Sequence, residues 1–343
     1  MKTQIKLCAA ALALVGATSA FAAGEATNVI FFLGDGMGPT TVTASRIYKY
    51  GEAGQLTMES LKRTARIKTY SLDGQTTDSA PSMAAYMTGV KMRNEVISMS
   101  ADTQPRDPVT KKNYTSGADS TCPAGNGTPA TTLLELAKAA GKSVGAVTTT
   151  TVTHATPAAT YAHICNRNGE NAIAAQAVPG GAGYNSALGA GLDVLLGGGT
   201  DHFLPTTAGG RRTDGRDLTA EFVTKGYTYV NSGSALMALD TAATTRLVGL
   251  FSKSLMNYEL DRAKPANAID EPSLADMTEK AIKLLQKNGK GFFLMVESGR
   301  IDHALHNTNA KRALEDTIAF DDAIKRALGL VDLKNTLVVV TAD

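Results

Sequence analysis

The stretch NVIFFLGD, residues 28–35, is the first of a series of short, almost continuously apolar runs. Similar runs recur along the chain: VGAVTTT (144–150), DVLLGG (193–198), LVGLFS (247–252), GFFLMVES (291–298) and TLVVVTAD (336–343). Strands that are buried on both faces of a parallel sheet require this composition. Helical patterns such as TTLLELAKAAG (131–141) and LADMTEKAIKLLQKNGK (274–290) lie between the runs. The sequence therefore predicts an α/β fold, a mainly parallel sheet flanked by helices on both faces.

Polar or acidic residues end several of these runs: Asp35, Thr148 to Thr150, Glu297 and Asp343. In open parallel sheets the ligand crevice lies beyond the carboxyl ends of the strands. We therefore expect these side chains to converge at one edge of the sheet. Two segments rich in Ser, Thr, Asp, Pro and Gly, residues 97–130 and 208–217, are predicted to be surface loops.

The charge balance gives no argument for a polyanionic partner. The formal net charge is +2, the chain has no tryptophan, and it contains no run of basic residues. We therefore expect no nucleic-acid partner and no membrane partner. The apolar fraction of 43% is sufficient for a sizeable core, which favours one large domain.

The N-terminus has the layout of a secretory signal: Lys2 and Lys6 precede an apolar run that ends in Ser-Ala-Phe-Ala. The expected organisation is a signal peptide over residues 1–22 and one α/β domain over 23–343, in a periplasmic or secreted protein. A buried N-terminal helix is the alternative. Export would leave Cys122 and Cys165, which could form one disulfide in an oxidising compartment or remain two buried thiols.

The motif FFLGDGMG places Asp35 after a buried strand with glycine on both sides, so that a cation or a phosphate could approach closely. An aspartate that merely caps the next helix is the alternative.

The motif VESGRIDHALH supplies Glu297 at a strand end, then Asp302 and His306 four residues apart on one helical face. Mixed carboxylate and imidazole ligands suit zinc. Incidental charges at a solvated helix start are the alternative.

The motif TVTHATPAATYAHICNR supplies His154, Thr156 and Arg167. A guanidinium can hold two phosphate oxygens at once, although many arginines are simply surface residues.

In TTDSAPSMAAYMTGVK (76–91), Ser79 stands at a predicted helix N-terminus, where free N–H groups favour an anion. A nearby bound zinc ion would lower the pKa of the hydroxyl without a histidine base. Helix capping by Ser79 or Asp78 is the alternative.

These motifs occur in a characteristic order. The set DGMG, TDSAPSMAAYMTGVK, THATPAATYAH, GGGTDHFLP, VESGRIDHALH and LVVVTAD resembles the alkaline phosphatase family and spans nearly the whole chain after residue 22. The resemblance implies a hydrolase of phosphate monoesters that uses a phosphoserine intermediate, two zinc ions and one magnesium ion. It also implies a homodimer for the complete protein.

The resemblance assigns roles residue by residue. It makes Ser79 the nucleophile, which also contacts zinc, and makes Arg167 the clamp on the phosphate. The implied metal ligands are Asp35, bridging one zinc and the magnesium; Thr156 and Glu297 for magnesium; Asp302 and His306 for one zinc; and Asp343 for the zinc beside Ser79. The family varies at two further positions, so His154 is expected near the magnesium and His303 near the phosphate. His163 and His202 match no metal position.

The chain departs from the family pattern at its end. In the family, the strand that ends in Thr-Ala-Asp continues into a histidine that binds zinc, and a later histidine completes the second zinc site. This sequence stops at Asp343. We therefore expect an incomplete C-terminal part, and the alternative function is an inactive phosphate- or metal-binding fragment. Sulfatase or phosphodiesterase activity is less favoured, because Met83 stands where the sulfatase pattern has arginine.

Overall fold

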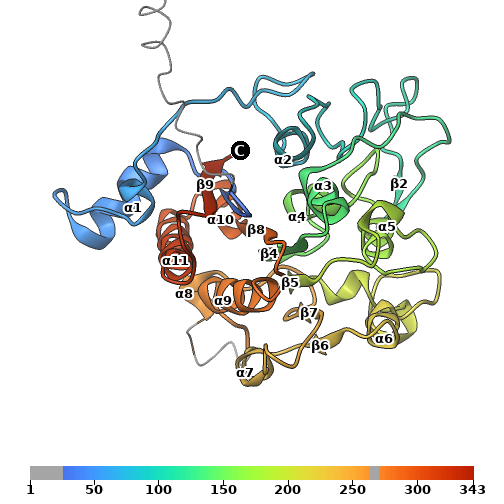
Figure 1. The fold of residues 1–343 in the computed structure, drawn as a ribbon. Helices are drawn as coiled ribbons and strands as arrows, with labels where there is room; N and C mark the ends of the chain where they lie inside the picture. Colours follow the sequence, from blue (N-terminus) through green and yellow to red (C-terminus); the bar gives the residue numbers. More distant parts are fainter. Residues whose placement is uncertain (1–25, 263, 265–269) are drawn as a thin grey trace, which may run out of the picture.

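The computed structural model describes residues 26–262, 264 and 270–343 (Figure 1). Its centre is a seven-stranded sheet in the order β6-β7-β5-β4-β8-β1-β9, in which every neighbouring pair of strands is parallel. The predicted mainly parallel sheet is thus confirmed. The predicted signal peptide, residues 1–22, lies outside the described residues.

All of the predicted apolar runs form strands. The strands of the sheet are β1 (Asn28–Gly34), β4 (Ser143–Thr151), β5 (Val194–Gly198), β6 (Thr228–Val230), β7 (Leu247–Leu250), β8 (Phe292–Ser298) and β9 (Thr336–Ala342). The strand β6 was not predicted, because three residues are too few to establish a period. The predicted loop 97–130 contains a small antiparallel pair, β2 (Thr115–Ser116) and β3 (Asp119–Ser120).

Helices cover both faces of the sheet. They are α1 (Pro39–Tyr50), α2 (Ser79–Thr88), α3 (Leu133–Ala139), α4 (Ala155–Tyr161), α5 (Glu170–Gln176), α6 (Leu218–Thr224), α7 (Gly233–Ala238), α8 (Glu259–Arg262), α9 (Leu274–Leu285), α10 (Arg300–His306) and α11 (Ala310–Leu328). In Figure 1 the orange and red helices α9 and α11 lie on one side of the strands, and the green helices α3 and α4 lie on the other.

The strand β1, which lies between β8 and β9, buries side chains on both of its faces. Phe31 and Leu33 belong to a core cluster that includes side chains of α2 and α4, whereas Ile30 and Phe32 belong to a second cluster with side chains of α9 and α11. Each such side chain contributes about 1.5–3 kcal/mol of hydrophobic stabilisation. This alternation explains why the run is apolar throughout, since neither face of the strand meets water.

The register of the strands brings the polar strand ends together. Gly34 pairs with Ser298 on one side and with Ala342 on the other, so the next residue, Asp35, lies between the ends of β8 and β9. Glu297 pairs with Thr148 across β8 and β4. The carboxyl ends of four adjacent strands therefore meet at one place, as expected for a parallel sheet.

A disulfide joins Cys122 to Cys165. It links the long loop before α3 to the segment that leads to Arg167. In the same region, the Arg167 backbone N–H donates to the Glu95 carbonyl over 2.8 Å. The loop and the arginine-bearing segment are thus held together by both covalent and hydrogen bonds.

Candidate functional site

A hollow of about 870 Å³ lies beyond the carboxyl ends of β1, β8 and β9. Most of the residues selected from the sequence line it: Asp35, Ser79, His154, Arg167, Asp302, His303, His306 and Asp343. Two others, Thr156 and Glu297, are fully buried and lie beneath it. The structure thus gathers residues from segments as distant as β1 and the end of β9.

The Ser79 hydroxyl lies against Asp35. Ser79 is the first residue of α2, and its Oγ donates to Asp35 Oδ1 over 3.1 Å. Asp35 does not cap the following helix, because α1 has Gly38 at its N-cap and no side-chain cap. That alternative interpretation of Asp35 is therefore excluded.

The glycine after Asp35 makes room for a second carboxylate. Gly36 has φ of +63°, which glycine adopts without strain, and a Cβ built there would lie 2.8 Å from Asp302 Oδ1. Its backbone N–H donates to Asp343 Oδ1 over 2.8 Å. Gly36 thus allows Asp302 and Asp343 to approach Asp35 from two directions.

One group of side chains has the arrangement of a cation site. Ligand atoms of Asp35, His154 and Glu297 lie within 4.8 Å of one another. Four buried atoms of the predicted site residues have no hydrogen-bond partner among the described residues: His154 Nδ1, Thr156 Oγ1, Glu297 Oε1 and His303 Nδ1. Buried polar atoms are normally satisfied, so unsatisfied donors and acceptors beside two carboxylates fit a bound divalent cation.

The electrostatics of these carboxylates lead to the same conclusion. Burial, reinforced by the charges of Asp343 and Glu297, holds the pKa of Asp35 well above its usual value. Burial likewise raises the pKa of Glu297 to about 7, although Thr148 and Thr150 donate hydrogen bonds to its Oε2. Several ionised carboxylates crowded in one place are unfavourable, and a divalent cation removes this repulsion.

Arg167 is held by two neighbours. Its Nη1 forms an ion pair with Asp78, and its Nη2 lies 2.9 Å from His154 Nε2. Asp78 occupies the N-cap position of α2, but its side chain makes no cap hydrogen bond. Instead the other Asp78 oxygen accepts from the Glu95 backbone N–H over 2.8 Å. The sequence suggested Asp78 only as a helix cap, and its adjacency to Ser79 was the one sign of this role.

The helix α10 forms another wall of the hollow. In this helix His306 Nε2 lies 3.4 Å from Asp302 Oδ1, and the His306 side chain is 78% exposed at the mouth of the hollow. The ring of His303 lies 5.4 Å from that of His154. Burial, with a contribution from Arg300, lowers the pKa of His303 to about 4, and burial and Arg167 hold the pKa of His154 well below its usual value. Both rings are therefore neutral at pH 7.

The two histidines that matched no metal position have other partners. His163 contacts the Ser98 carbonyl and Glu135 over 2.6 and 2.7 Å. His202 is buried and lies 3.1 Å from Asn171 Oδ1. Neither residue lines the hollow.

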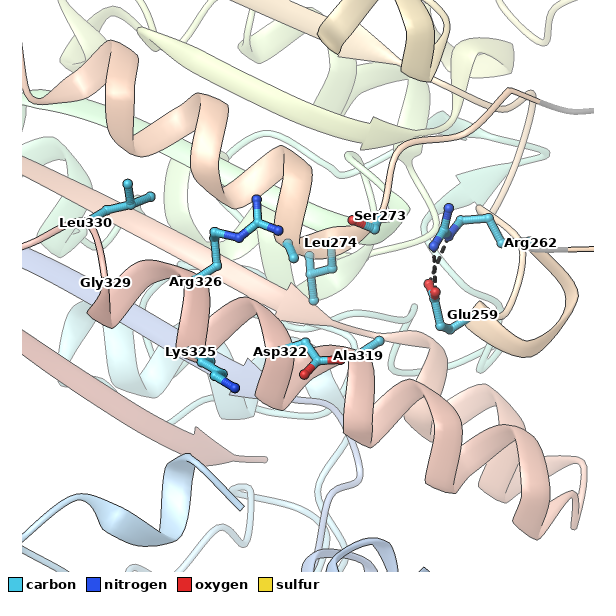
Figure 2. Close-up of a pocket in the computed structure, with 11 residues that line it drawn as sticks. Glu259, Arg262, Ser273, Leu274, Ala319, Asp322, Lys325, Arg326, Gly329 and Leu330 are labelled. Atoms are coloured by element: carbon cyan, nitrogen blue, oxygen red, sulfur yellow. Dashed lines mark hydrogen bonds and ion pairs between the residues drawn. The ribbon is translucent and has the colours of Figure 1, made fainter. Parts of the chain in front are cut away.

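A second cavity, of about 590 Å³, lies between α8, α9 and α11 (Figure 2). Its arginines already have acidic partners: Arg262 pairs with Glu259, and Arg326 pairs with Glu279. Among the described side chains around it, none has a buried polar atom without a hydrogen-bond partner. This cavity therefore lacks the unsatisfied groups that distinguish the first.

Comparison with known proteins identifies the family and the fold. The alkaline phosphatase family profile matches residues 26–343. The tissue-nonspecific alkaline phosphatase of Rattus norvegicus is 40% identical over 346 residues, which cover 93% of this chain and 63% of the relative. The crystal structure of Thermus thermophilus alkaline phosphatase is similar with a TM-score of 0.76 and 34% identity, over 93% of this chain and 59% of that one. The chain belongs to the alkaline phosphatase family.

Another similar solved structure is described with a bound metal ion. A mutant alkaline phosphatase of the Antarctic bacterium TAB5, 27% identical with a TM-score of 0.71, is described with magnesium bound in its M3 site. That match covers 93% of this chain and 78% of the other. The chain spans about 63% of the length of the rat relative.

The expected periplasmic or secreted location is contradicted by the similar proteins. The similar proteins include tissue-nonspecific isozymes and a Bombyx mori relative, 36% identical over 96% of this chain and 62% of its own length, that is named a membrane-bound alkaline phosphatase. The expectation relied on a leader-like N-terminus, a pattern that does not distinguish a free product from an anchored one. Within the part of the chain that the structure describes, no helix has both the length and the apolarity to cross a membrane.

Proposed function

We propose that this chain carries the catalytic site of a phosphate monoester hydrolase in which Ser79 is the nucleophile. The observation that carries the proposal is the hydrogen bond of 3.1 Å from Ser79 Oγ to Asp35, at the N-terminus of α2 and inside a hollow lined by Arg167. This bond directs the hydroxyl proton toward Asp35 and leaves a lone pair of the oxygen facing the hollow.

The helix and the arginine supply binding for the phosphoryl group. The first N–H groups of α2 are not used within the helix and favour an anion beside Ser79. Arg167 offers a planar fork of donors, already oriented by Asp78 and His154. The phosphoryl group would therefore be held with its phosphorus facing Ser79 Oγ, which lowers the entropic cost of attack.

The reaction follows as two displacements. Ser79 Oγ forms a bond to phosphorus while the bond to the alcohol oxygen breaks, and the alcohol leaves with a proton. Water then attacks the phosphoserine, which releases phosphate and restores the hydroxyl. The hollow's open mouth leaves the alcohol side unconfined, so the proposal specifies the phosphate monoester class and not one alcohol.

The proposed ligands of each cation have the atoms that the cation prefers. Asp35, Glu297 and Thr156, with His154 beside them, would hold magnesium, because oxygen ligands suit that ion. Asp302 and His306 would hold one zinc, and Asp343 would hold a second zinc next to Ser79. Bound cations of this kind stabilise an ionised hydroxyl and neutralise the charge that develops on the entering and leaving oxygens.

Substrate comparison tests this function. The purified chain, supplied with zinc and magnesium, is assayed with an aryl phosphate, an aryl sulfate and a bis-aryl phosphate. We expect release of phosphate from the monoester alone, its loss in Ser79→Ala, and its retention in Ser82→Ala, a control one turn further along α2. Turnover of the sulfate or the diester would assign a different activity. Phosphate binding without turnover would assign the binding-fragment alternative.

A further inference from the structure

The side chain of Tyr258 contacts the whole length of α10. At the start of the helix, the guanidinium carbon of Arg300 lies 3.7 Å from the centre of the Tyr258 ring. In the middle, Ala304 and Tyr258 belong to one small buried cluster. At the end, the amide of Asn307, the C-cap residue, donates to the Tyr258 hydroxyl over 3.1 Å. One buried side chain thus contacts both ends and the centre of the helix.

Tyr258 is itself fixed to α11. Its ring also has the guanidinium carbon of Arg312 at 4.7 Å, and Arg312 pairs with Asp261 over 2.7 Å. The backbone N–H of the next residue, Glu259, donates to the Asp316 carboxylate over 3.3 Å. The ring is therefore held by α11 as well as by α10.

The helix α10 needs such support. It has only seven residues, and isolated helices of this length are unstable because nucleation is costly. It carries Asp302, His303 and His306, and the His306 side chain is largely exposed. Attraction between a guanidinium and an aromatic face, with one hydrogen bond at the far end, adds a restraint to the packing of α10 against α11.

We propose that Tyr258 is a positioning residue that sets the orientation of α10 and thereby the cation affinity of Asp302 and His306. This inference rests on the proposed function, in which those two side chains hold a zinc ion. Tyr258 does not line the hollow, so it acts only through the helix. Residues that orient metal ligands typically change metal affinity 10- to 100-fold when they are replaced.

Zinc affinity and amide exchange test the inference in the full chain. Equilibrium dialysis measures the dissociation constant for Zn²⁺, and hydrogen exchange measures the protection of α10 amides. We expect Tyr258→Leu, which removes ring and hydroxyl, to weaken zinc binding about tenfold or more and to accelerate exchange in α10. Tyr258→Phe and Asn307→Ala remove only the terminal hydrogen bond, so each is expected to weaken binding about threefold.

Tyr227 provides a matched control. It is also a buried tyrosine whose hydroxyl donates to a carbonyl, that of Leu192, and whose ring has an arginine, Arg246, at 5.5 Å. It belongs to the opposite end of the sheet, next to β6. Tyr227→Leu should lower the melting temperature without changing zinc affinity.

A second comparison separates the inference from the proposed function. Asp302→Asn should abolish the zinc site, and if it does not, the proposed ligand set fails. If Asp302→Asn removes zinc binding while Tyr258→Leu binds zinc as the unaltered chain does, the positioning role is overturned. Should Tyr258→Leu fail to fold, Asn307→Ala decides, because Asn307 is exposed and its replacement removes no buried side chain. Unchanged zinc affinity and unchanged exchange in that variant would also overturn the role.

Discussion

The Ser79 hydroxyl donates to the Asp35 carboxylate, although 44 residues separate the two in the sequence. Asp35 directly follows the strand β1 and Ser79 begins the helix α2, so the contact joins two rigid elements. No histidine accepts a hydrogen bond from Ser79 Oγ among the described residues. A serine that faces a carboxylate and a candidate cation site suits activation by bound cations better than activation by an imidazole base.

Arg167→Ala should weaken binding of inorganic phosphate by about 10- to 100-fold, because hydrogen bonds to a charged group contribute about 1.5–3 kcal/mol. Competition by phosphate against an aryl phosphate measures this effect. Arg216, which pairs with Glu221 and does not line the hollow, provides the control. Equal inhibition constants in Arg167→Ala and Arg216→Ala would contradict the assigned clamp.

Glu297→Gln should abolish the rise in melting temperature that Mg²⁺ produces. A cation at a concentration of 100 times its dissociation constant stabilises the folded chain by about 2.7 kcal/mol. The substitution removes one of the charged ligands of that cation. In the cation-free chain the variant should be at least as stable as the original, since a crowded carboxylate is neutralised. Glu170→Gln is the control, because Glu170 accepts from Thr151 and Thr153 away from the hollow. A Mg²⁺-dependent shift that survives in Glu297→Gln would refute the ligand assignment.

Gly36→Ala should reduce both stability and cation affinity. Its positive φ and the close approach of Asp302 make a Cβ unfavourable, by about 1–3 kcal/mol, and Asp302 must move to accommodate it. Gly38→Ala is a matched control two residues away, since a Cβ there meets nothing within 4 Å and φ is −69°. Urea unfolding and zinc dialysis compare the two variants. Equal losses of stability and of zinc affinity in the two variants would show that position 36 does not require glycine.

Asp316 predicts a pH dependence of stability. Burial raises the pKa of Asp316 to about 8, whereas the unfolded value is about 3.9. The folded state then holds a proton that the unfolded state has lost, so this residue's contribution to the free energy of unfolding falls as pH rises from about 4 to about 8. Asp316→Asn should therefore be more stable, relative to the original cation-free chain, at pH 9 than at pH 5. The same stability difference at both pH values in urea titrations would contradict the raised pKa.

The sequence predicted the sheet well because its strands are buried on both faces, which makes them apolar throughout and easily recognised. It also selected Asp35, Glu297 and Asp343 as strand-end residues, and the parallel register brings them together. It could not predict that Asp78 would orient Arg167, because that ion pair joins segments 89 residues apart. Nor could it predict the contact of Tyr258 with α10, which depends on how α8 packs against α11. Local patterns identify elements, but partners across elements follow from the tertiary arrangement.

The proposed function requires that Ser79 becomes covalently phosphorylated during turnover. The direct measurement is to mix the chain, zinc and magnesium with a radiolabelled phosphate monoester, stop the reaction in acid, and locate the label by peptide mapping. We expect one phosphoserine, in the peptide that contains Ser79, and no label in Ser79→Ala. Phosphate release without any labelled peptide, or a label on another residue, would contradict the role of Ser79 as the nucleophile.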